Sequence, residues 1–375
     1  MSKVKLGDVA IEHKETCKGS KDGYPIVGLE HLVSEEVTLT AWDEGSDNTF
    51  TKMFRKGNVL FGRRRAYLKK AAVAPFDGIC SGDITVIEAI PDRILPELLP
   101  FIIQNDELFD FAVGKSAGSL SPRVKWEHLK NYEFELPDMD KQRELAELLW
   151  AMDATKKSYQ KLIAATDELV KSQFMEQFGD PNSNPLSWPT ATIGEICDIK
   201  SGTTLPAAKE NEGGEIAYIK VADMNIPGNE KYITTSTKFV SATTAGNGVF
   251  PIGTVVFPKN GAAVATNKKR ITHVPTCVDL NTMGVTPRIK IDEQYLYLWF
   301  QLLNLDSISL VSAIPQISAK TMGAQVIMLP PLDLQEQFAA FVQQSDKSKF
   351  AALSCSNLNL WSCSAIWERT RKASL

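Results

Sequence analysis

Residues 136–142 read LPDMDKQ and residues 329–335 read LPPLDLQ, so the motif Leu-Pro-x-x-Asp-x-Gln occurs twice, 193 residues apart. Two further pairs of segments recur at distances of 187 and 196 residues: LGD (6–8) with IGE (193–195), and FRKGNVLF (54–61) with FPIGTVVF (250–257). A repeat this long exceeds the roughly 20–50 residues of a solenoid unit. The sequence therefore predicts two copies of one whole domain, with small insertions in the loops.

A long helix is predicted directly after the first copy of the motif. Residues 138–178 contain neither glycine nor proline, and the run ends at Gly179-Asp180-Pro181, a typical helix stop. A continuous helix of this length would extend about 60 Å. Its apolar side chains repeat every three and four residues, which indicates a seam against a partner helix; a buried core helix is the alternative. The apolar seam residues are Leu145, Leu148, Met152, Tyr159, Leu162 and Leu169, and the remaining seam positions are Thr155, Thr166 and Gln173.

The rest of the sequence divides around this helix into two domains of mixed α/β character. We predict a mixed α+β fold in which two similar globular domains, 1–137 and 181–331, are separated by long helices, 138–180 and 332–375, that form an antiparallel coiled coil. Within the first domain, the patterns predict strands and a helix in the segments 57–61, 84–90 and 95–113, respectively.

The second long helix differs from the first. Shifting the seam by 193 residues places Phe338 and Phe341 on it, but the following seam positions are mostly polar. From Ala351 onward the chain is rich in serine, cysteine, asparagine and tryptophan. We therefore expect the two helices to pair weakly beyond the first two turns of the second helix.

Charge is distributed unevenly along a chain whose net charge is only −4. Residues 48–76 contain eight lysines and arginines and no acid, and residues 231–278 contain six and no acid. These windows fall at corresponding places in the two copies. Because the local field decides whether a polyanion docks, the recurrence favours phosphate binding over an ordinary solvated basic face.

No catalytic residue set is evident. The sequence contains no GxxxxGK[ST] phosphate loop, no GxGxxG loop after a predicted strand, no methyltransferase quartet and no complete nuclease motif. Four separated histidines and six cysteines without a CxxC pair indicate neither a metal site nor a disulfide framework. No apolar run is long enough to span a membrane. We expect a cytoplasmic protein with reduced thiols, no metal and no cofactor.

The candidate DNA contacts are cations and small polar residues in the basic windows and in two equivalent loops, 114–123 and 313–320. Clustered cations bind the phosphate backbone, arginine also reads guanine, and glutamine pairs with adenine. Plain surface loops are the alternative. The candidates are Arg63, Arg64, Arg65, Tyr67, Lys69, Lys70, Lys115, Ser119, Arg123, Lys259, Asn260, Lys268, Lys269, Arg270, Gln316 and Lys320.

The chain resembles the specificity subunit of type I restriction-modification systems over residues 1 to about 350. The resemblance rests on the order and spacing of the repeated motif together with four segments: NVLFGRRRAYLKK (58–70), FMEQFGDP (174–181), VFPKNG (256–261) and NKKR (267–270). It implies two target-recognition domains, each reading one half of a split double-stranded DNA sequence. The long helices would act as a ruler and bind methyltransferase subunits, and motor-nuclease subunits would join for cleavage. The subunit-binding residues of the first helix would be Leu145, Leu148, Met152, Tyr159, Leu162 and Leu169.

The resemblance also implies that this chain has no active site, and that S-adenosylmethionine, ATP and Mg²⁺ bind the partner subunits. The sequence departs from the family after Phe350, where relatives continue the helix with leucine, lysine and glutamate heptads. A degenerate or truncated specificity subunit is therefore one alternative, and a protein-interaction scaffold that does not bind DNA is another.

Overall fold

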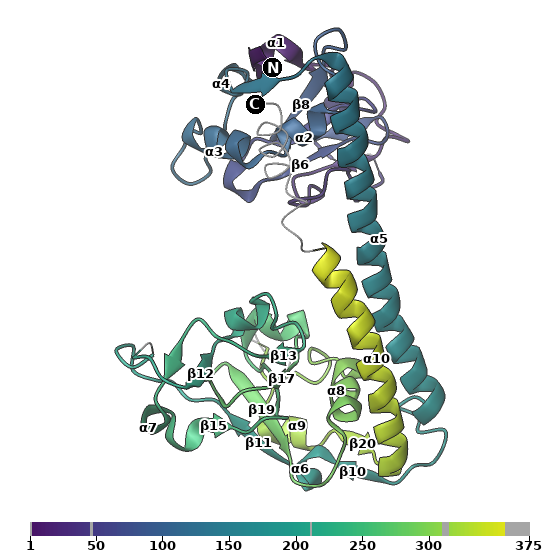
Figure 1. Cartoon of the computed structure of the whole chain (residues 1–375), viewed down its shortest axis with the longest axis vertical. Coiled ribbons are helices and arrows are strands. Elements are labelled where there is room, and N and C mark those ends of the chain that lie inside the picture. The colour runs from purple at the N-terminus through teal and green to yellow at the C-terminus, as the bar shows by residue number, and fades with distance from the viewer. Residues whose placement is uncertain (1, 46–47, 211, 310–314, 357–375) are drawn as a thin grey trace. The chain divides into compact units, whose positions relative to one another are not determined.

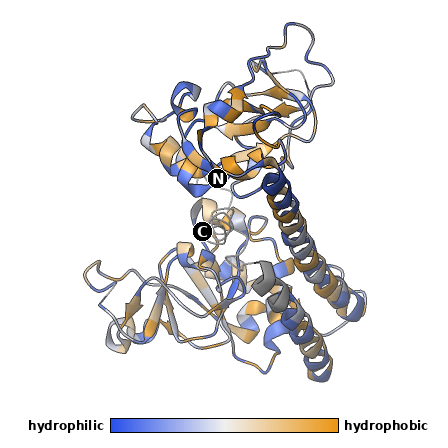
Figure 2. Cartoon of the chain, turned by 45° about the horizontal axis from the view of Figure 1, so that its top comes forward, coloured by the Kyte–Doolittle hydropathy of each residue, from blue (hydrophilic) through white to orange (hydrophobic). Residues whose placement is uncertain are grey.

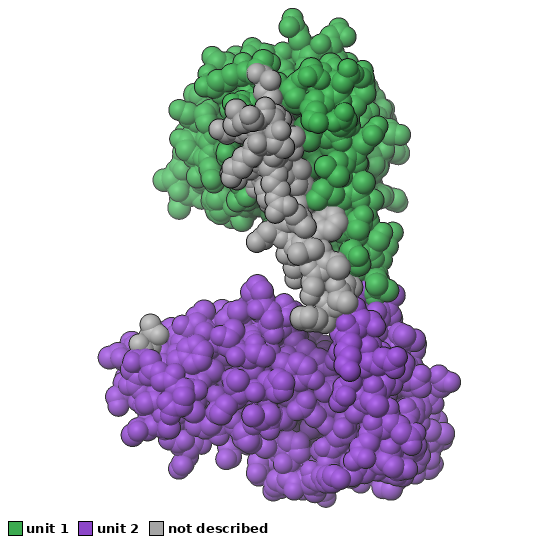
Figure 3. All heavy atoms as spheres, viewed as in Figure 1, with its two compact units in different colours: residues 1–162, 352–375 green, residues 163–351 purple. Residues whose placement is uncertain are grey.

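The computed structural model describes residues 2–45, 48–210, 212–309 and 315–356. The chain forms two compact units (Figure 3), unit 1 from residues 1–162 and 352–375 and unit 2 from residues 163–351. Among the described residues, no helix has the length and apolar character needed to cross a membrane.

Unit 1 combines three small sheets with short helices (Figure 1). Its four-stranded sheet has the antiparallel order β2-β8-β5-β6, its three-stranded sheet has the order β3-β7-β4, and β1 pairs with β9. The elements are β1 (Ser2–Lys5), α1 (Leu6–Val9), β2 (Ala10–Glu12), β3 (Ile26–Val27), β4 (Lys52–Phe54), β5 (Val59–Gly62), η1 (Ala66–Leu68), β6 (Ala71–Val73), β7 (Gly78–Cys80), β8 (Ile84–Ala89), α2 (Leu99–Ile103), α3 (Asp106–Gly114), α4 (Trp126–Leu129) and β9 (Glu133–Leu136), followed by α5 (Met139–Phe178).

Unit 2 repeats this plan with more strands. Its sheets have the orders β11-β19-β16-β17-β13 and β14-β12-β18-β15, and β10 pairs with β20. The elements are β10 (Thr190–Thr192), α6 (Ile193–Ile196), β11 (Cys197–Ser201), β12 (Ile216–Ile219), η2 (Val221–Asn225), β13 (Tyr232–Ile233), β14 (Phe239–Val240), α7 (Ala242–Ala245), η3 (Gly246–Gly248), β15 (Val249–Phe250), β16 (Val255–Pro258), η4 (Gly261–Thr266), β17 (Arg270–Thr272), β18 (Thr276–Val278), β19 (Thr282–Pro287), α8 (Glu293–Leu302), α9 (Ala319–Gly323), β20 (Val326–Met328) and α10 (Leu332–Ser356).

The predicted repeat is confirmed by these sheets. The order β2-β8-β5-β6 recurs as β11-β19-β16-β17, and the order β3-β7-β4 recurs as β12-β18-β15, including a parallel first pair and an antiparallel second pair. Strand β5 in unit 1 and strand β16 in unit 2 are buried on both faces, and their alternate side chains enter different apolar clusters. Val59 and Phe61 enter one cluster and Leu60 another, as do Val255 and Phe257 relative to Val256.

The repeated glutamine of the opening motif anchors each long helix to its own unit. Gln142 is buried, donates from Nε2 to the carbonyl of Pro137 at 2.8 Å, and accepts from the backbone N–H of Leu95 at 2.8 Å. Gln335 makes the equivalent bonds to the carbonyl of Pro330 and the N–H of Asp292, at 2.8 and 2.9 Å. One side chain thus satisfies two backbone groups at the base of each helix.

The helical pattern predicted across residues 95–113 forms two helices rather than one. Asn105 interrupts it, because its side chain accepts a hydrogen bond from the N–H of Glu107 at 2.9 Å and caps the start of α3. Side chains of Asn, Asp and Ser can hydrogen-bond to nearby backbone N–H groups, which starts a new helix in place of continuing the previous one.

Helix α5 matches the predicted long helix, but its buried stripe differs from the predicted seam. The first position of each predicted heptad is buried or half-buried, namely Leu145, Met152, Tyr159, Thr166 and Gln173. The second position is exposed throughout, at Leu148, Thr155, Leu162 and Leu169. The inward neighbours lie four residues along instead of three, at Leu149, Lys156, Ile163, Val170 and Gln177. Figure 2 shows hydrophobic and hydrophilic residues interleaved along the helix. Spacings of three and four residues both keep side chains on one face of a helix. The sequence pattern alone therefore placed the second seam position of each heptad one residue too early.

Within unit 2, helix α10 packs antiparallel to the second half of α5 (Figure 1). Phe338 stacks edge-on against Phe174 and Phe178 near the start of α10, and Lys349 pairs with Asp167 at 2.6 Å further along. Here too the burial is shifted by one residue, because Val342 is buried and Phe341 is half-buried. After Val342, described contacts of α10 include two ion pairs, made by Asp346 and Lys349. Residues 357–375, the greater part of the atypical tail, lie outside the described residues.

Candidate nucleic-acid interface

In unit 1, the turn after β5 and the segment before α4 lie side by side. Arg64 and Arg123 form a backbone bridge. The N–H of Arg65 donates to the carbonyl of Pro122 at 2.8 Å, and the N–H of Val124 donates to the carbonyl of Arg63 at 3.0 Å. Two candidate segments separated by more than fifty residues in sequence therefore form one surface.

Asp83 connects the arginines of this surface. Its carboxylate accepts from Arg123 Nε and Nη2 at 2.6 and 3.1 Å, and Arg64 Nη1 lies 3.5 Å away. Arg64 Nε donates to Ser121 Oγ at 2.7 Å. The bond from Arg123 lowers the pKa of Asp83. Both arginine side chains are about 40% exposed, so the network orients them without hiding their outer N–H groups.

The other candidates of unit 1 differ in how freely they are presented. Lys69 pairs with Asp106 on α3, which raises the pKa of the lysine, and Lys70 donates to the carbonyl of Leu29 at 2.8 Å. Arg63 is half-buried, and its Nε has no hydrogen-bond partner within the described part of the chain. Exposed side chains belong to Arg65, Tyr67, Lys115 and Ser119.

Unit 2 builds the same backbone frame at equivalent positions. Asn260 and Gln316 form the bridge, the N–H of Gly261 donates to the carbonyl of Pro315 at 2.8 Å, and the N–H of Ile317 donates to the carbonyl of Lys259 at 2.9 Å. Arg65 and Gly261 are equivalent to each other, and both have a left-handed backbone, with φ of 55° and 71°. Ala313 and Ile314, which begin the predicted loop, lie outside the described residues.

The side chains on this second frame are mainly neutral. Asn260 Nδ2 donates to Asn281 Oδ1 at 3.4 Å, and Lys259 Nζ donates to Ser201 Oγ at 3.0 Å. Lys268 is half-buried and contacts the side chain of Asn225. Gln316 and Lys320 are exposed.

Two candidates of unit 2 require correction. Lys269 is fully buried, and its ammonium donates to the carbonyl of Leu303 at 2.6 Å and to Asn267 Oδ1 at 2.7 Å. Burial lowers its pKa to about 8. Arg270 is half-buried, donates to the carbonyl of Met224 at 3.0 Å, and burial lowers its pKa. Lys269, directly before β17, is directed inward by its bonds to Leu303 and Asn267, so it is not a surface contact, and the guanidinium of Arg270 serves a structural bond.

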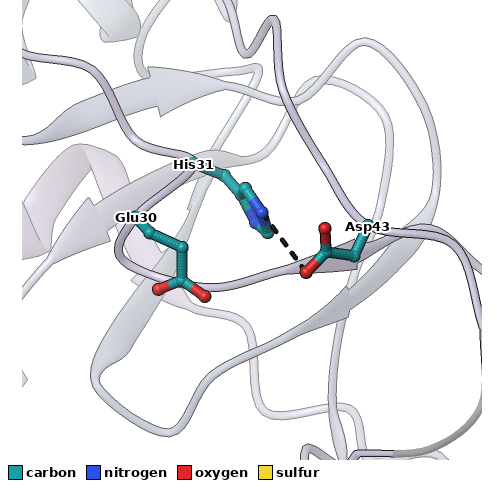
Figure 4. A group of neighbouring side chains, drawn as sticks. All are labelled: Glu30, His31 and Asp43. Carbon is teal, nitrogen blue, oxygen red and sulfur yellow. Dashed lines mark ion pairs between the residues drawn. The ribbon is translucent and has the colours of Figure 1, made fainter. Parts of the chain in front are cut away.

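Glu30, His31 and Asp43 bring three possible ligand atoms together in unit 1 (Figure 4). His31 Nδ1 accepts the backbone N–H of Gly28 at 2.9 Å, and Nε2 faces Asp43 at 3.5 Å. This bond places the lone pair on Nδ1 and hence the proton of the neutral ring on Nε2. A metal at Nε2 requires the opposite tautomer, so the cluster fits a hydrogen-bonded network better than a metal centre.

Sequence reasoning missed Asp83, Ser121 and Asn281. The first two orient the arginines of unit 1, and Asn281 contacts Asn260 in unit 2. Asp83 lies beyond the acid-free window that drew attention to this region. The equivalence of Asp83 and Asn281 follows from strand register, because Gly62 pairs with Ile84 in unit 1 and Pro258 pairs with Thr282 in unit 2.

A family model for the type I restriction modification DNA specificity domain matches residues 1–165 and 185–354. One similar solved structure is a chain from a study of complex assembly and conformational transition of the type I R-M system, with 22% identity, 98% of this chain and 96% of that chain covered, and a TM-score of 0.55. The S subunit from M. genitalium has 14% identity, coverage of 96% and 95%, and a TM-score of 0.51. The HsdS subunit from Thermoanaerobacter tengcongensis has 20% identity, coverage of 98% and 95%, and a TM-score of 0.41.

The family match spans most of the chain and covers both copies of the repeat. This protein belongs to the type I restriction-modification DNA specificity family, and its role is that of a non-catalytic specificity subunit. The first and second of the structures above share its fold, in agreement with the predicted mixed α+β architecture.

Proposed function

We propose that this subunit reads a bipartite double-stranded DNA target, one half through residues 1–137 and the other through residues 181–331. The observation that carries the proposal is the repeated backbone frame at 63–65 with 122–124 and at 259–261 with 315–317, which presents different side chains in the two domains. A shared frame with different side chains suits two readers of two different sequences.

The proposed interface combines phosphate and base contacts. Exposed or half-exposed cations supply sequence-independent affinity through release of counterions. Lys69 is held in an ion pair with Asp106, and Lys70 and Arg270 are bonded to backbone carbonyls, so these three are secondary candidates. Lys269 is excluded by its burial. Arg64 and Arg123 also have protein partners but are about 40% exposed and stay primary. The primary candidates are Arg63, Arg64, Arg65, Tyr67, Lys115, Ser119, Arg123, Lys259, Asn260, Lys268, Gln316 and Lys320.

We further propose that the helices at 138–180 and 332–375 set the half-site spacing and bind methyltransferase subunits, with motor-nuclease subunits joining the assembly. Leu148, Leu162 and Leu169 support this, because they are 51%, 51% and 54% exposed along one helix. Leu145 is buried within unit 1 and is not part of that surface. S-adenosylmethionine, ATP and Mg²⁺ would be bound by the partner subunits.

A salt-titrated binding assay on duplex DNA tests the DNA role. We expect the logarithm of the affinity to fall by about 0.9 per phosphate contact for each tenfold increase in salt. Removal of both Arg63 and Arg65 side chains should flatten that dependence, whereas Lys290→Ala, at an exposed cation far along the sequence from both loops, should not. Binding that does not respond to salt would favour the protein-interaction scaffold.

Modularity has its own test. Replacing residues 186–330 with the corresponding domain of a relative should change one half of the recognised sequence and leave the other half intact. If both halves changed together, independent reading by two domains would be wrong.

A further inference from the structure

A third position completes the equivalence between the two loop frames. The N–H of Arg63 donates to the carbonyl of Asp83 at 3.0 Å, and the N–H of Lys259, at the equivalent place, donates to the carbonyl of Asn281 at 2.8 Å. Asp83 and Asn281 therefore occupy the same position relative to the turn. Each unit has three such equivalent side chains: Arg64, Asp83 and Arg123 in unit 1, and Asn260, Asn281 and Gln316 in unit 2.

In unit 1 these three side chains form a charged set. Arg123 uses Nε and Nη2 on the Asp83 carboxylate and Nη1 on the carbonyl of Ser121 at 3.4 Å, which leaves one N–H on each of its two terminal nitrogens. Arg64 donates through Nε to Ser121 and through Nη1 to Asp83 at 3.5 Å, so the N–H groups of its Nη2 stay available. Two outward N–H groups of a fixed guanidinium match the O6 and N7 acceptors that guanine presents in the major groove.

In unit 2 the same positions form a neutral set. Asn260 uses one Nδ2 hydrogen on Asn281, and Asn281 in turn donates to Asp279 Oδ2 at 3.1 Å. The second Nδ2 hydrogen and the Oδ1 atom of Asn260 remain for a ligand, and Gln316 is exposed beside it. One amide donor and one amide acceptor match N7 and the N6 amino group of adenine.

The charged set of unit 1 and the neutral set of unit 2 differ at all three positions. Two cations oriented by an anion are replaced by two amides with an amide at the anion's position, so all three positions change together from charged to neutral. Generic phosphate contacts need no such joint replacement, because any cation in unit 2 would serve.

We propose that these three equivalent positions are base-reading sets, and that unit 1 reads guanine while unit 2 reads adenine. This inference rests on the proposed function of bipartite DNA recognition and assigns base identity within it. Arg64 and Arg123 contact guanine and Asp83 orients them. Asn260 and Gln316 contact adenine, and Asn281 orients Asn260.

Exchange of the sets tests the proposal. The full chain, bound to its methyltransferase subunits, is used to select duplexes from a randomised library. The triple variant Asn260→Arg, Asn281→Asp and Gln316→Arg should replace adenine by guanine at one or two positions of one half-site, with a reversal of preference of about tenfold or more. The variant Arg64→Asn, Asp83→Asn and Arg123→Gln should make the reverse change in the other half-site.

A charge-preserving variant guards against loss of folding. Arg64→Lys with Arg123→Lys keeps both positive charges but removes the planar fork that contacts guanine at two points. We expect an unchanged salt dependence together with relaxed preference at one or two positions. Retained preference in this variant would overturn guanine reading by the arginines.

The remaining outcomes separate the inference from the proposed function. If the exchanged sets change affinity equally for all sequences, the three positions hold phosphates and the inference is wrong, although DNA recognition stands. If the unaltered chain selects no sequence at all, the proposed function itself fails. Lys3→Ala and Lys290→Ala, at exposed cations outside both frames, serve as matched controls and should leave both half-sites unchanged.

Discussion

The turn after β5 in unit 1 and the turn after β16 in unit 2 have the same backbone contacts and almost none of the same side chains. The shared part consists of main-chain hydrogen bonds and strands whose alternate residues are buried on both faces. Because these bonds do not depend on side-chain identity, the outward positions are free to vary. A fixed frame with exchangeable residues is what a family of sequence readers requires.

The same comparison holds at the base of each long helix. Leu145, Ala146 and Leu149 of α5 are buried against unit 1, and Phe338, Ala339 and Val342 are buried at the equivalent places of α10. Together with the two anchoring glutamines, they attach each helix rigidly to its own domain. The two units therefore differ in the side chains of their loops and agree in the buried positions that attach the long helices.

The largest expected effect breaks this helix attachment. Phe338→Ala should destabilise unit 2 by about 3–5 kcal/mol, and Leu145→Ala should destabilise unit 1 by about 2–5 kcal/mol, because each removes a buried side chain from a packed cluster. Leu148→Ala is the matched control, since that side chain is 51% exposed, and should change stability by about 0.5 kcal/mol or less. Denaturant unfolding measures all three. A loss at Leu148 equal to that at Leu145 would reinstate the seam predicted from sequence.

The next effect concerns the glutamine anchors. Gln142→Ala and Gln335→Ala should each destabilise the attached unit by about 2–3 kcal/mol, because one buried and one partly buried backbone group lose their partners. Gln160→Ala, at an exposed position of α5, is the control. Thermal unfolding of the three variants provides the measurement. A large loss in one unit alone would show that the two anchors are not equivalent.

Lys269 gives a prediction that depends on pH. Its pKa falls from 10.5 in the unfolded chain to about 8 in the fold, so the unfolded state binds more protons between those values. The penalty for burying the charge is full below pH 8 and disappears as pH rises to 10.5.

The variant Lys269→Met removes this titration. Its stability relative to the original chain should decline by about 2–4 kcal/mol between pH 7 and pH 10.5, because the original chain loses its penalty. Groups common to both proteins cancel in the difference, which is measured by denaturant unfolding at each pH. A difference that stays constant with pH would show that the ammonium is not desolvated.

The smallest effect is expected at the far contact of α10. Lys349→Ala removes the ion pair with Asp167. The two side chains are 26% and 51% exposed, so the loss should lower the free energy of unfolding by about 1 kcal/mol or less. The loss should shrink further in high salt. A loss comparable to that of Phe338→Ala would mean that pairing of α10 with α5 extends well beyond Val342, contrary to the expectation of weak pairing there.

Local sequence was sufficient for the repeat and the long helix. Each of these depends on a signal that the sequence carries directly: a recurring motif and a run free of glycine and proline. The repeat was informative because it required the same fold twice, and the sheet orders of the two units confirm that requirement.

Tertiary structure decided which of those residues face outward and which partners they have. The spacing of α5 is compatible with two stripes, and only packing selects Leu149 and Val170 over Leu148 and Leu169. The run Lys268-Lys269-Arg270 looks uniformly basic, yet the fold buries its middle residue, whose ammonium binds the carbonyl of Leu303. Asp83 meets Arg123 across forty residues of sequence, a contact that depends on loop closure and burial, which no local pattern records.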